Sequence, residues 1–217
     1  MGRIVVTEFV SVDGVVEDPG GVEGFTHGGW VFEIDRGDEG EQFKLDEALG
    51  SHAMLLGRRT YDTFAASWPS RSGEWADKLN SMPKYVVSST LTDPTWNNTT
   101  VISSGGLDEE IARIKQAHDG DIAVHGSTQL VQALLDRDLV DEVRLMVFPV
   151  VLGAGQRLFG ATSDKKPLRL VDSRTVGDGV TIVTYEPVRG AAPAAEGGSL
   201  AEARAAAFRR TGIEESA

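Results

Sequence analysis

The sequence predicts an α/β protein with a mostly parallel sheet, helices on both faces and an antiparallel C-terminal edge. Strand-like and helix-like segments alternate as far as about Val147, which is typical of parallel strands joined by crossover helices. After that point the strands follow one another directly. The last two flank Gly177-Asp178-Gly179, which indicates a terminal β-hairpin.

Short runs of β-branched, aromatic or apolar residues predict the strands. The first run is the most pronounced, and it ends at the turn signal Asp13-Gly14. In chain order, the predicted strands are Arg3–Val12, Ala53–Leu56, Lys84–Ser88, Thr100–Ile102, Ile122–Val124, Glu142–Phe148, Leu168–Arg174 and Val180–Tyr185.

Helices are predicted between these strands. The spacing of Leu107, Ile111 and Ile114 places apolar side chains on one helix face, and the acidic residues 108–110 suit the positive N-terminal end of that helix. The predicted helices cover residues 42–49, 60–67, 74–79, 107–118 and 127–136.

The composition excludes several classes of protein. Lys and Arg number 21 and Asp and Glu 33, which gives a net charge of −12 and argues against non-specific nucleic-acid binding. The absence of cysteine excludes disulfide frameworks, zinc ribbons, iron–sulfur clusters and thiol catalysis, and four histidines make a metal centre an unfavoured hypothesis. No apolar run approaches the roughly 18 residues that span a bilayer, and the N-terminus does not resemble a signal peptide. We therefore expect a cytoplasmic protein that binds no membrane.

The composition changes near residue 189. Residues 1–189 form the expected domain, and residues 190–198 are small and rich in helix breakers, as in a linker. Residues 199–210 could form a short Ala/Arg helix with a capping box of Ser199 and Glu202. We expect residues 190–217 to be a linker and a mobile or docking tail.

Three predicted strand ends carry residues suited to a nucleotide. Gly57-Arg58-Arg59-Thr60 joins a strand to a helix, so free helix N–H groups and two arginines meet there; a solvated surface pair is the alternative. Ser88-Ser89 ends another strand, where α/β sheets bind ligands, although it could also be an ordinary polar turn. The third, Gly126-Ser127-Thr128-Gln129, combines a glycine with a helix start.

Two glycine-rich stretches lie outside these strand ends. Residues 15–29 have little periodicity, and a loop of this length inside a compact domain is often functional. Residues 148–159 form either a plain crossover between strands or a segment close to the ligand.

Four segments with specific order and spacing carry a family resemblance. They are MLLGRRTYDTF, KYVVSSTL, IAVHGSTQLVQALL and FPVVLGAGQRLF, and they follow the opening RIVVTEFVSVDGVVE. Over about residues 3–188 the chain resembles the dihydrofolate-reductase-like superfamily. It is most similar to stand-alone proteins like the reductase domain of the bifunctional riboflavin-biosynthesis deaminase–reductase. The cysteine-dependent motif of the deaminase half is missing.

The resemblance implies a three-layer sandwich and NADPH as cofactor. The residues that match the family's cofactor segments are Gly57, Arg58, Arg59, Thr60, Ser88, Ser89, Gly126, Ser127, Thr128 and Gln129. Asp13 matches the segment beside the nicotinamide and the substrate, and Glu33 or Asp35 falls near the carboxylate that orients a pterin in dihydrofolate reductases. We therefore predict Asp13 and Glu33 as catalytic residues, and Asp13, Trp30 and Phe159 as substrate-binding residues.

The function implied is NADPH-dependent hydride transfer to a small heterocycle. The substrate would resemble 5-amino-6-(5-phosphoribosylamino)uracil or a pterin. Hydride transfer needs no protein nucleophile, because the cofactor carries the chemistry and the protein aligns the reactants and excludes water. The alternative is an NADP(H)-binding sensor or interaction module without turnover.

A homodimer is also expected. Exposed antiparallel strand edges favour association, and the resemblance implies pairing through the C-terminal strands. We predict an interface that uses residues 142–148 and the hairpin strand at 180–185.

Overall fold

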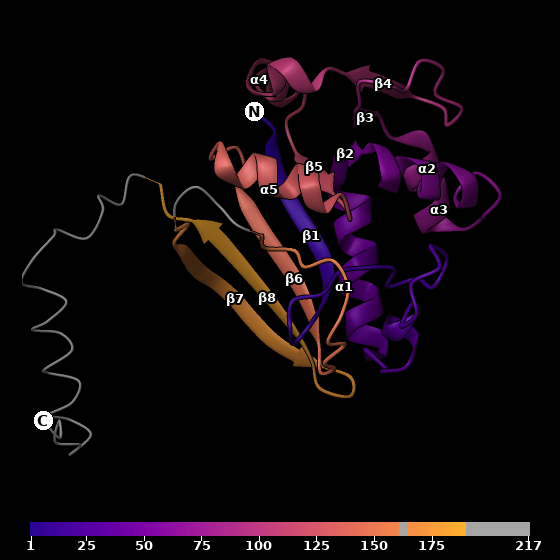
Figure 1. Cartoon of the computed structure of the whole chain (residues 1–217), viewed down its shortest axis with the longest axis vertical. Coiled ribbons are helices and arrows are strands. Elements are labelled where there is room, and N and C mark those ends of the chain that lie inside the picture. Colours follow the sequence, from indigo (N-terminus) through magenta and orange to yellow (C-terminus); the bar gives the residue numbers. More distant parts are fainter. Residues whose placement is uncertain (161–164, 190–217) are drawn as a thin grey trace, which may run out of the picture. The chain divides into compact units, whose positions relative to one another are not determined.

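The computed structural model describes residues 1–160 and 165–189, and the predicted linker and tail at 190–217 lie outside the described residues. Within those ranges the strands form a single sheet of eight, in the order β4-β3-β2-β5-β1-β6-β8-β7 (Figure 1). The pairs from β4 to β6 are parallel, and β8 is antiparallel to both β6 and β7. The predicted fold class, a mainly parallel sheet with an antiparallel C-terminal hairpin, is confirmed.

The strand bounds lie close to the predicted ones, because each strand is a short apolar run with turn residues at its ends. The strands are β1 Arg3–Ser11, β2 Ser51–Gly57, β3 Lys84–Val87, β4 Thr99–Ile102, β5 Asp121–Val124, β6 Glu142–Phe148, β7 Leu168–Val176 and β8 Val180–Pro187.

The helices connect the parallel strands. They are α1 Gly37–Gly50, α2 Arg58–Ser67, α3 Glu74–Ser81, α4 Leu107–Ala117 and α5 Thr128–Asp136, with short 3-10 turns η1 Trp30–Phe32 and η2 Ser104–Gly106. The largest difference from prediction is α1, which begins five residues before the predicted helix.

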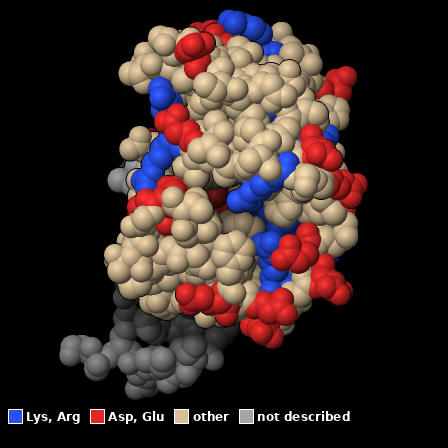
Figure 2. All heavy atoms as spheres, turned by 90° about the vertical axis from the view of Figure 1, so that its right-hand side faces the viewer, with Lys and Arg blue, Asp and Glu red and all other residues tan. Residues whose placement is uncertain are grey.

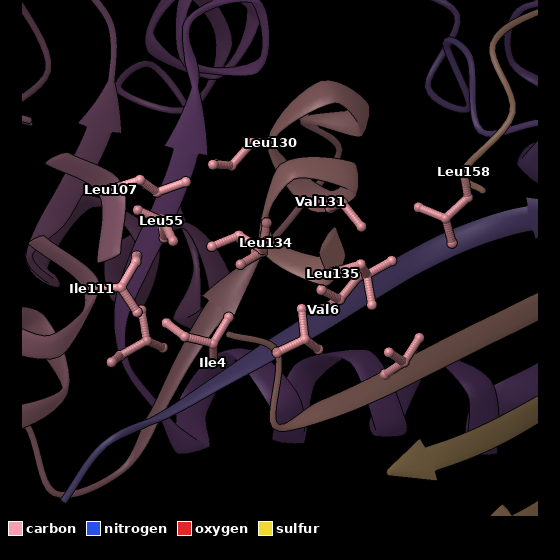
Figure 3. Packing of buried hydrophobic residues seen from close by; sticks show 14 of the residues in the cluster. Ile4, Val6, Leu55, Leu107, Ile111, Leu130, Val131, Leu134, Leu135 and Leu158 are labelled. Carbon is pink, nitrogen blue, oxygen red and sulfur yellow. The ribbon is translucent and has the colours of Figure 1, made fainter. Parts of the chain in front are cut away.

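Alternate residues of the strands face two different cores, as strand periodicity requires. In β2, Leu55 packs in the cluster beneath α4 and α5, whereas Met54 and Leu56 pack in the cluster with α2 and α3. Figure 3 shows the first cluster, in which leucines of α5 lie over Ile4 and Val6 of β1. A third cluster joins α1 and η1 to β6 and β8. The helices therefore cover both faces of the sheet.

The buried face of α1 is unexpectedly polar. Lys44 and Glu47 are buried, with the Lys44 ammonium 2.6 Å from Oε2 of Glu47 and 2.6 Å from Oγ1 of Thr7 on β1. The Thr7 hydroxyl donates to Glu47 at 2.9 Å, and Arg144 of β6 lies 3.6 Å from the same carboxylate. A charged network thus joins α1 to the centre of the sheet, where the sequence pattern indicated only the apolar residues of the helix.

Neither of the two strands predicted to form the dimer interface lies at an edge of the sheet. β6 lies between β1 and β8, so its backbone is already paired on both sides, and the edge at this end of the sheet belongs to β7. On β7, Leu170 is 51% exposed and Val171 47% exposed. Within the described residues no helix has the length and apolar character needed to cross a membrane.

We expect a homodimer in which β7 rather than β6 supplies the paired edge, because unpaired backbone groups and apolar side chains occur together on β7. The double substitution Leu170→Lys with Val171→Lys should then yield a monomer by light scattering. Val151→Lys, which charges an even more exposed apolar residue outside β7, should leave the mass unchanged. A wild-type protein with a monomer mass at micromolar concentration would contradict the prediction.

Removal of one charge from the network of α1 should be strongly destabilising. Lys44→Ala leaves the buried Glu47 carboxylate without its closest cation, and loss of one partner of a buried pair costs about 3–5 kcal/mol. Urea unfolding should show this loss in the free energy of unfolding. Replacement of both Lys44 and Glu47 by Met should cost less than Lys44→Ala alone, and the opposite order would show that the pair contributes little.

Candidate active site

A large cavity opens where the central strand β5 stops. β1 pairs with β5 only from Arg3 to Val6, and β2 pairs with it only as far as Leu55, opposite Val124. Beyond Val124, the neighbouring strands continue without a strand between them, and a cavity of about 1280 Å³ lies there. This exceeds the roughly 300–1,000 Å³ of common ligand pockets, so a dinucleotide and a second molecule can be accommodated. Figure 2 shows a hollow on this side of the molecule, with basic side chains at its rim.

The first turns of three helices line this cavity. α2 contributes Arg58 to Thr60, α4 contributes Leu107, and α5 contributes Thr128 to Leu130. In the described structure, the first turns of α2 and α5 contain no acidic residue, and neither helix has a side-chain cap. Their free N–H groups and dipoles therefore favour an anion in the cavity.

Arg58 and Arg59 line the cavity, but they face different parts of it. The Arg58 guanidinium lies 2.8 Å from Asp62 and 3.4 Å from the Thr90 hydroxyl, close to the end of β3. Arg59 lies 3.0 Å from Glu23 and 3.5 Å from Glu17 of the glycine-rich loop. Both arginines are about half exposed, so an anionic ligand can compete with these carboxylates.

The hydroxyl groups predicted to hold the cofactor are partly engaged within the protein. Ser127 Oγ accepts the Gly57 N–H at 2.8 Å and donates to the His125 carbonyl at 2.9 Å. Thr60 Oγ1 accepts the Ser127 N–H at 2.8 Å. These bonds join the end of β2 to the end of β5. Ser127 and Thr60 therefore fix the shape of the anion-binding turns, in addition to lining the cavity.

The third predicted segment includes two residues in the left-handed region. Gly126 has φ +55° and Ser127 has φ 56°, so the chain turns sharply before α5 begins. A Cβ atom at Gly126 would lie 2.9 Å from Oγ1 of Thr60. The glycine is thus needed for the close approach of the β5 end to α2.

The end of the β3 segment also lines the cavity. Ser88 Oγ accepts the N–H groups of Thr90 at 3.2 Å and Leu91 at 3.1 Å, which shapes the turn, while Ser89 is exposed at the cavity surface. All ten predicted cofactor residues line this single cavity.

The glycine-rich loop, the end of α2 and the start of α3 also line the cavity. Residues 16–20, 22 and 23 of the loop line it, which places the loop where a functional role was predicted. Trp68 and Trp75 add aromatic walls, and the guanidinium of Arg71 lies 4.7 Å from the Trp68 ring centre. The indole N–H of Trp75 is buried without a hydrogen-bond partner in the described structure. This side suits a planar ring with acceptor atoms.

Asp13 does not line the cavity. Its carboxylate accepts the Ser11 hydroxyl at 2.7 Å and the N–H groups of Leu152 and Gly153 at 3.1 and 3.0 Å. The bond from Ser11 is the main cause that lowers the pKa of Asp13 to about 2. Asp13 is therefore ionised at neutral pH and joins the end of β1 to the segment after β6, a position that does not suit a proton donor.

Three other predicted residues also lie outside the cavity lining. Trp30 is 1% exposed, packs edge-to-face on Phe148 and donates its indole N–H to the carbonyl of Glu17, so its ring belongs to the core. Glu33 is exposed at the end of η1, and Phe159 is 45% exposed. The conformation of the loops decides where these three side chains lie, and the spacing of residues in the sequence does not reveal that conformation.

His125 lines the cavity but does not act as a cation there. Burial, with a smaller contribution from Lys44, lowers the pKa of His125 to about 3. The imidazole is therefore neutral at physiological pH, and its ring packs 6.3 Å from that of Phe64.

Glu8 is the acidic residue of the cavity that the sequence analysis missed. It lies on β1, is 6% exposed and lines the cavity. Desolvation raises the pKa of Glu8 well above its ordinary value, and this effect exceeds the opposing effects of the Gly126 N–H and Lys44. The sequence feature that could have identified Glu8 is a charged residue in the middle of a largely apolar strand.

One protein family and two relatives match most of the length of the chain. The RibD C-terminal domain family matches residues 3–182 of the chain. The uncharacterized protein YyaP of Bacillus subtilis is 27% identical over 188 residues, which is 84% of this chain and 94% of YyaP. YwjB of the same organism is 28% identical over 174 residues, or 80% of this chain and 91% of YwjB.

Solved structures share the fold. A Shewanella sp. PV-4 protein assigned to riboflavin biosynthesis has a TM-score of 0.69 at 20% identity and covers 86% of this chain and 99% of its own. A pyrimidine reductase-like protein from Corynebacterium diphtheriae has a TM-score of 0.57 at 13% identity, with 86% and 92% coverage. RibD from Acinetobacter baumannii has a TM-score of 0.57 at 19% identity; the match covers 87% of this chain and 58% of RibD.

Gly126→Ala should lower stability. The left-handed φ costs a residue with a Cβ about 1–2 kcal/mol, and the new methyl group also meets Thr60. Urea unfolding should show at least this loss. Gly50→Ala is a suitable control, because a Cβ at Gly50 meets nothing within 4 Å. Equal stability of the two variants would contradict the assigned role of the turn.

Proposed function

Because the chain belongs to the RibD C-terminal domain family, we propose that it is an NADPH-dependent reductase acting on a small heterocyclic substrate. Family membership supports an oxidoreductase. The finer proposal is hydride transfer to a compound like 5-amino-6-(5-phosphoribosylamino)uracil, with a pterin-like compound as the second candidate.

A single observation carries this proposal: one cavity contains both an anion-binding side and an aromatic side. The first turns of α2 and α5, with Arg58 and Arg59, suit the phosphates of a dinucleotide. Trp68 and Trp75 line the other side, which suits a planar substrate. The split between β1 and β2 joins the two sides, so that two ligands can meet inside the protein.

When bound, NADPH would supply the hydride. The residues of the chain would hold and orient the two molecules and keep water from the reacting atoms. The uncapped N–H groups of α5 would bind the pyrophosphate. In the protein without ligand, the pairs of Arg59 with Glu17 and Glu23 hold the glycine-rich loop beside the first turn of α2, and an anionic cofactor would take over Arg59 from these carboxylates.

The residues around the end of β3 support NADPH rather than NADH as the cofactor. Ser88, Ser89 and Thr90 line the cavity there, and Arg58 lies 3.4 Å from the Thr90 hydroxyl. A 2′-phosphate can meet a guanidinium and hydroxyl groups at this place. An NAD site instead requires a carboxylate to bind the free 2′-hydroxyl.

The phosphoribosyl pyrimidine is favoured as substrate by Arg71. Its guanidinium lies over the Trp68 ring, and among the described ion pairs none involves it. Arg36 and Lys44, the other basic residues of the substrate side, are paired with Glu41 and Glu47. Arg71 can therefore bind a substrate phosphate without losing an internal partner, a contact that a pterin does not require.

The test is NADPH oxidation with 5-amino-6-(5-phosphoribosylamino)uracil, dihydrofolate and a quinone as separate acceptors. We expect turnover with the pyrimidine and a product heavier by two hydrogen atoms in mass spectrometry. Turnover with dihydrofolate alone would support the pterin candidate. Tight NADPH binding without turnover of any acceptor would instead support an NADP(H)-binding sensor or interaction module.

The two arginines should differ in their effect on cofactor choice. Arg58→Ala should weaken NADPH binding about 10- to 100-fold and NADH binding much less, since a hydrogen bond to a charged group contributes about 1.5–3 kcal/mol. Arg59→Ala should weaken both cofactors alike, because Arg59 faces the loop side of the cavity. Fluorescence titrations measure both affinities.

Arg113→Ala serves as the control for lost charge. Arg113 is an exposed residue of α4 paired with Glu110, and it does not line the cavity. An equal loss of NADPH and NADH affinity in Arg58→Ala would show that Arg58 binds the shared part of the cofactor.

A further inference from the structure

Glu8 occupies a position on β1 where the strand pattern calls for an apolar side chain. Ile4, Val6 and Val10, its neighbours at every second position, all pack in the cluster beneath α4 and α5. Glu8 is 6% exposed, and its partner in the adjacent strand is Leu145. A carboxyl group in such a row is expensive to bury unless it has a partner or a function.

One oxygen of this carboxyl group has no partner. Oε1 of Glu8 is buried and makes no hydrogen bond in the described structure, although the Gly126 N–H interacts with the carboxyl group. Four buried side-chain atoms in the described residues share this condition, and only those of Glu8 and Trp75 belong to residues that line the cavity. A ligand in the cavity can therefore satisfy Oε1.

The surroundings of Glu8 favour its protonated form. The charged groups that affect it come from α1, where Lys44 favours the carboxylate and Glu47 opposes it. From the end of β5, His125 is uncharged because burial holds its pKa near 3. Lys44 is bound by Glu47 and Thr7, so its charge is already compensated. Burial dominates, and the pKa of Glu8 lies well above its ordinary value.

We propose that Glu8 is a catalytic residue, whose carboxylic acid gives the proton that accompanies the hydride to the substrate. This inference rests on the proposed function. Glu8 stands on β1 just beyond the point where its pairing with β5 ends, and it lines the same cavity as the first turns of α2 and α5 and the two tryptophans. Its contact with the Gly126 N–H places it beside the turn that precedes α5, so a group reduced by a cofactor bound at that turn would lie within its reach.

The chemistry balances with the groups present. The substrate has a C=N or C=O bond, whose carbon receives the hydride from the reduced nicotinamide. The π electron pair of that bond moves to the nitrogen or oxygen, which takes the proton from Glu8. The O–H bond of Glu8 breaks, a new N–H or O–H bond forms, and Glu8 is left as a carboxylate. Water at the cavity mouth then returns a proton.

The other acidic and basic groups of this region do not offer the same proton. Asp13 lies outside the cavity and has a pKa of about 2. Lys44 donates to two internal acceptors, and His125 is neutral at physiological pH. Among the residues that line the described cavity, Glu8 alone combines burial, a carboxyl oxygen without a partner and a raised pKa.

The kinetic test compares wild type with Glu8→Gln, using NADPH and 5-amino-6-(5-phosphoribosylamino)uracil. Glutamine keeps the shape and the hydrogen bonds but cannot supply the proton. We expect kcat to fall about 100-fold or more, with the NADPH dissociation constant changed less than about threefold. The wild-type rate should decline as pH rises through the pKa of Glu8, and the residual rate of Glu8→Gln should lack this step. Glu8→Asp should recover part of the rate.

Carbon-13 NMR of the carboxyl groups tests the proton itself, without turnover or cofactor. The resonance that disappears in Glu8→Gln should be that of a protonated acid at neutral pH. The pH dependence of the unfolding free energy gives a second test of the raised pKa. The unfolded chain ionises Glu8 at its ordinary pKa, so wild type should lose stability relative to Glu8→Gln as pH rises from that value to the pKa in the folded protein.

The outcomes separate this inference from the proposed function. Turnover by wild type together with equal turnover by Glu8→Gln overturns the role of Glu8 alone, as does an ionised Glu8 resonance at neutral pH. An absence of turnover in wild type overturns both. Glu142→Gln controls for general loss of stability, since Glu142 is a buried carboxylate of β6 outside the cavity. It should retain kcat.

Discussion

β5 stops at Val124, while β1 and β2 on either side of it continue toward the same end of the sheet. This early stop creates a gap between two strands that no backbone fills. The first turns of α2 and α5 lie at the gap, and so do the residues of β1 beyond Val6. The cavity therefore arises because β5 is shorter than its two neighbours. The groups that line it lie beside the position that a longer β5 would occupy.

A gap in a sheet must be held open and prevented from collapsing. The hydrogen bonds of Ser127 with Gly57, His125 and Thr60 tie the end of β5 to β2 and α2. On the other side, the network of Lys44, Glu47 and Thr7 fixes α1 against β1. The residues that give the cavity its rigidity are therefore largely the same residues that line it, and changes in them affect stability and binding together.

The order of helices and strands along the chain could be predicted from the sequence, because short apolar runs and turn glycines mark each element locally. The order of the strands within the sheet could not, because it depends on which distant strands pair. The sequence also indicated the residues of α2, β3 and α5 that line the cavity, since a strand that ends in glycine before a helix start places N–H groups at the end of the sheet. The residues predicted as catalytic or substrate-binding do not line it. Trp30 is a core residue because η1 turns it onto Phe148, and Asp13 faces backbone of residues 152 and 153, both long-range contacts that spacing cannot show. Glu8 was missed because a single charged residue in a strand has no periodic pattern.

The ion pairs of Arg59 with Glu17 and Glu23 also affect how binding depends on salt. An anionic ligand that binds Arg59 replaces these carboxylates, so arrival of the ligand and release of the glycine-rich loop form one exchange. Salt weakens both the pairs that are broken and the contact that is formed. The two effects on affinity oppose each other, so the affinity of the ligand should vary less with ionic strength than the charge of Arg59 alone suggests.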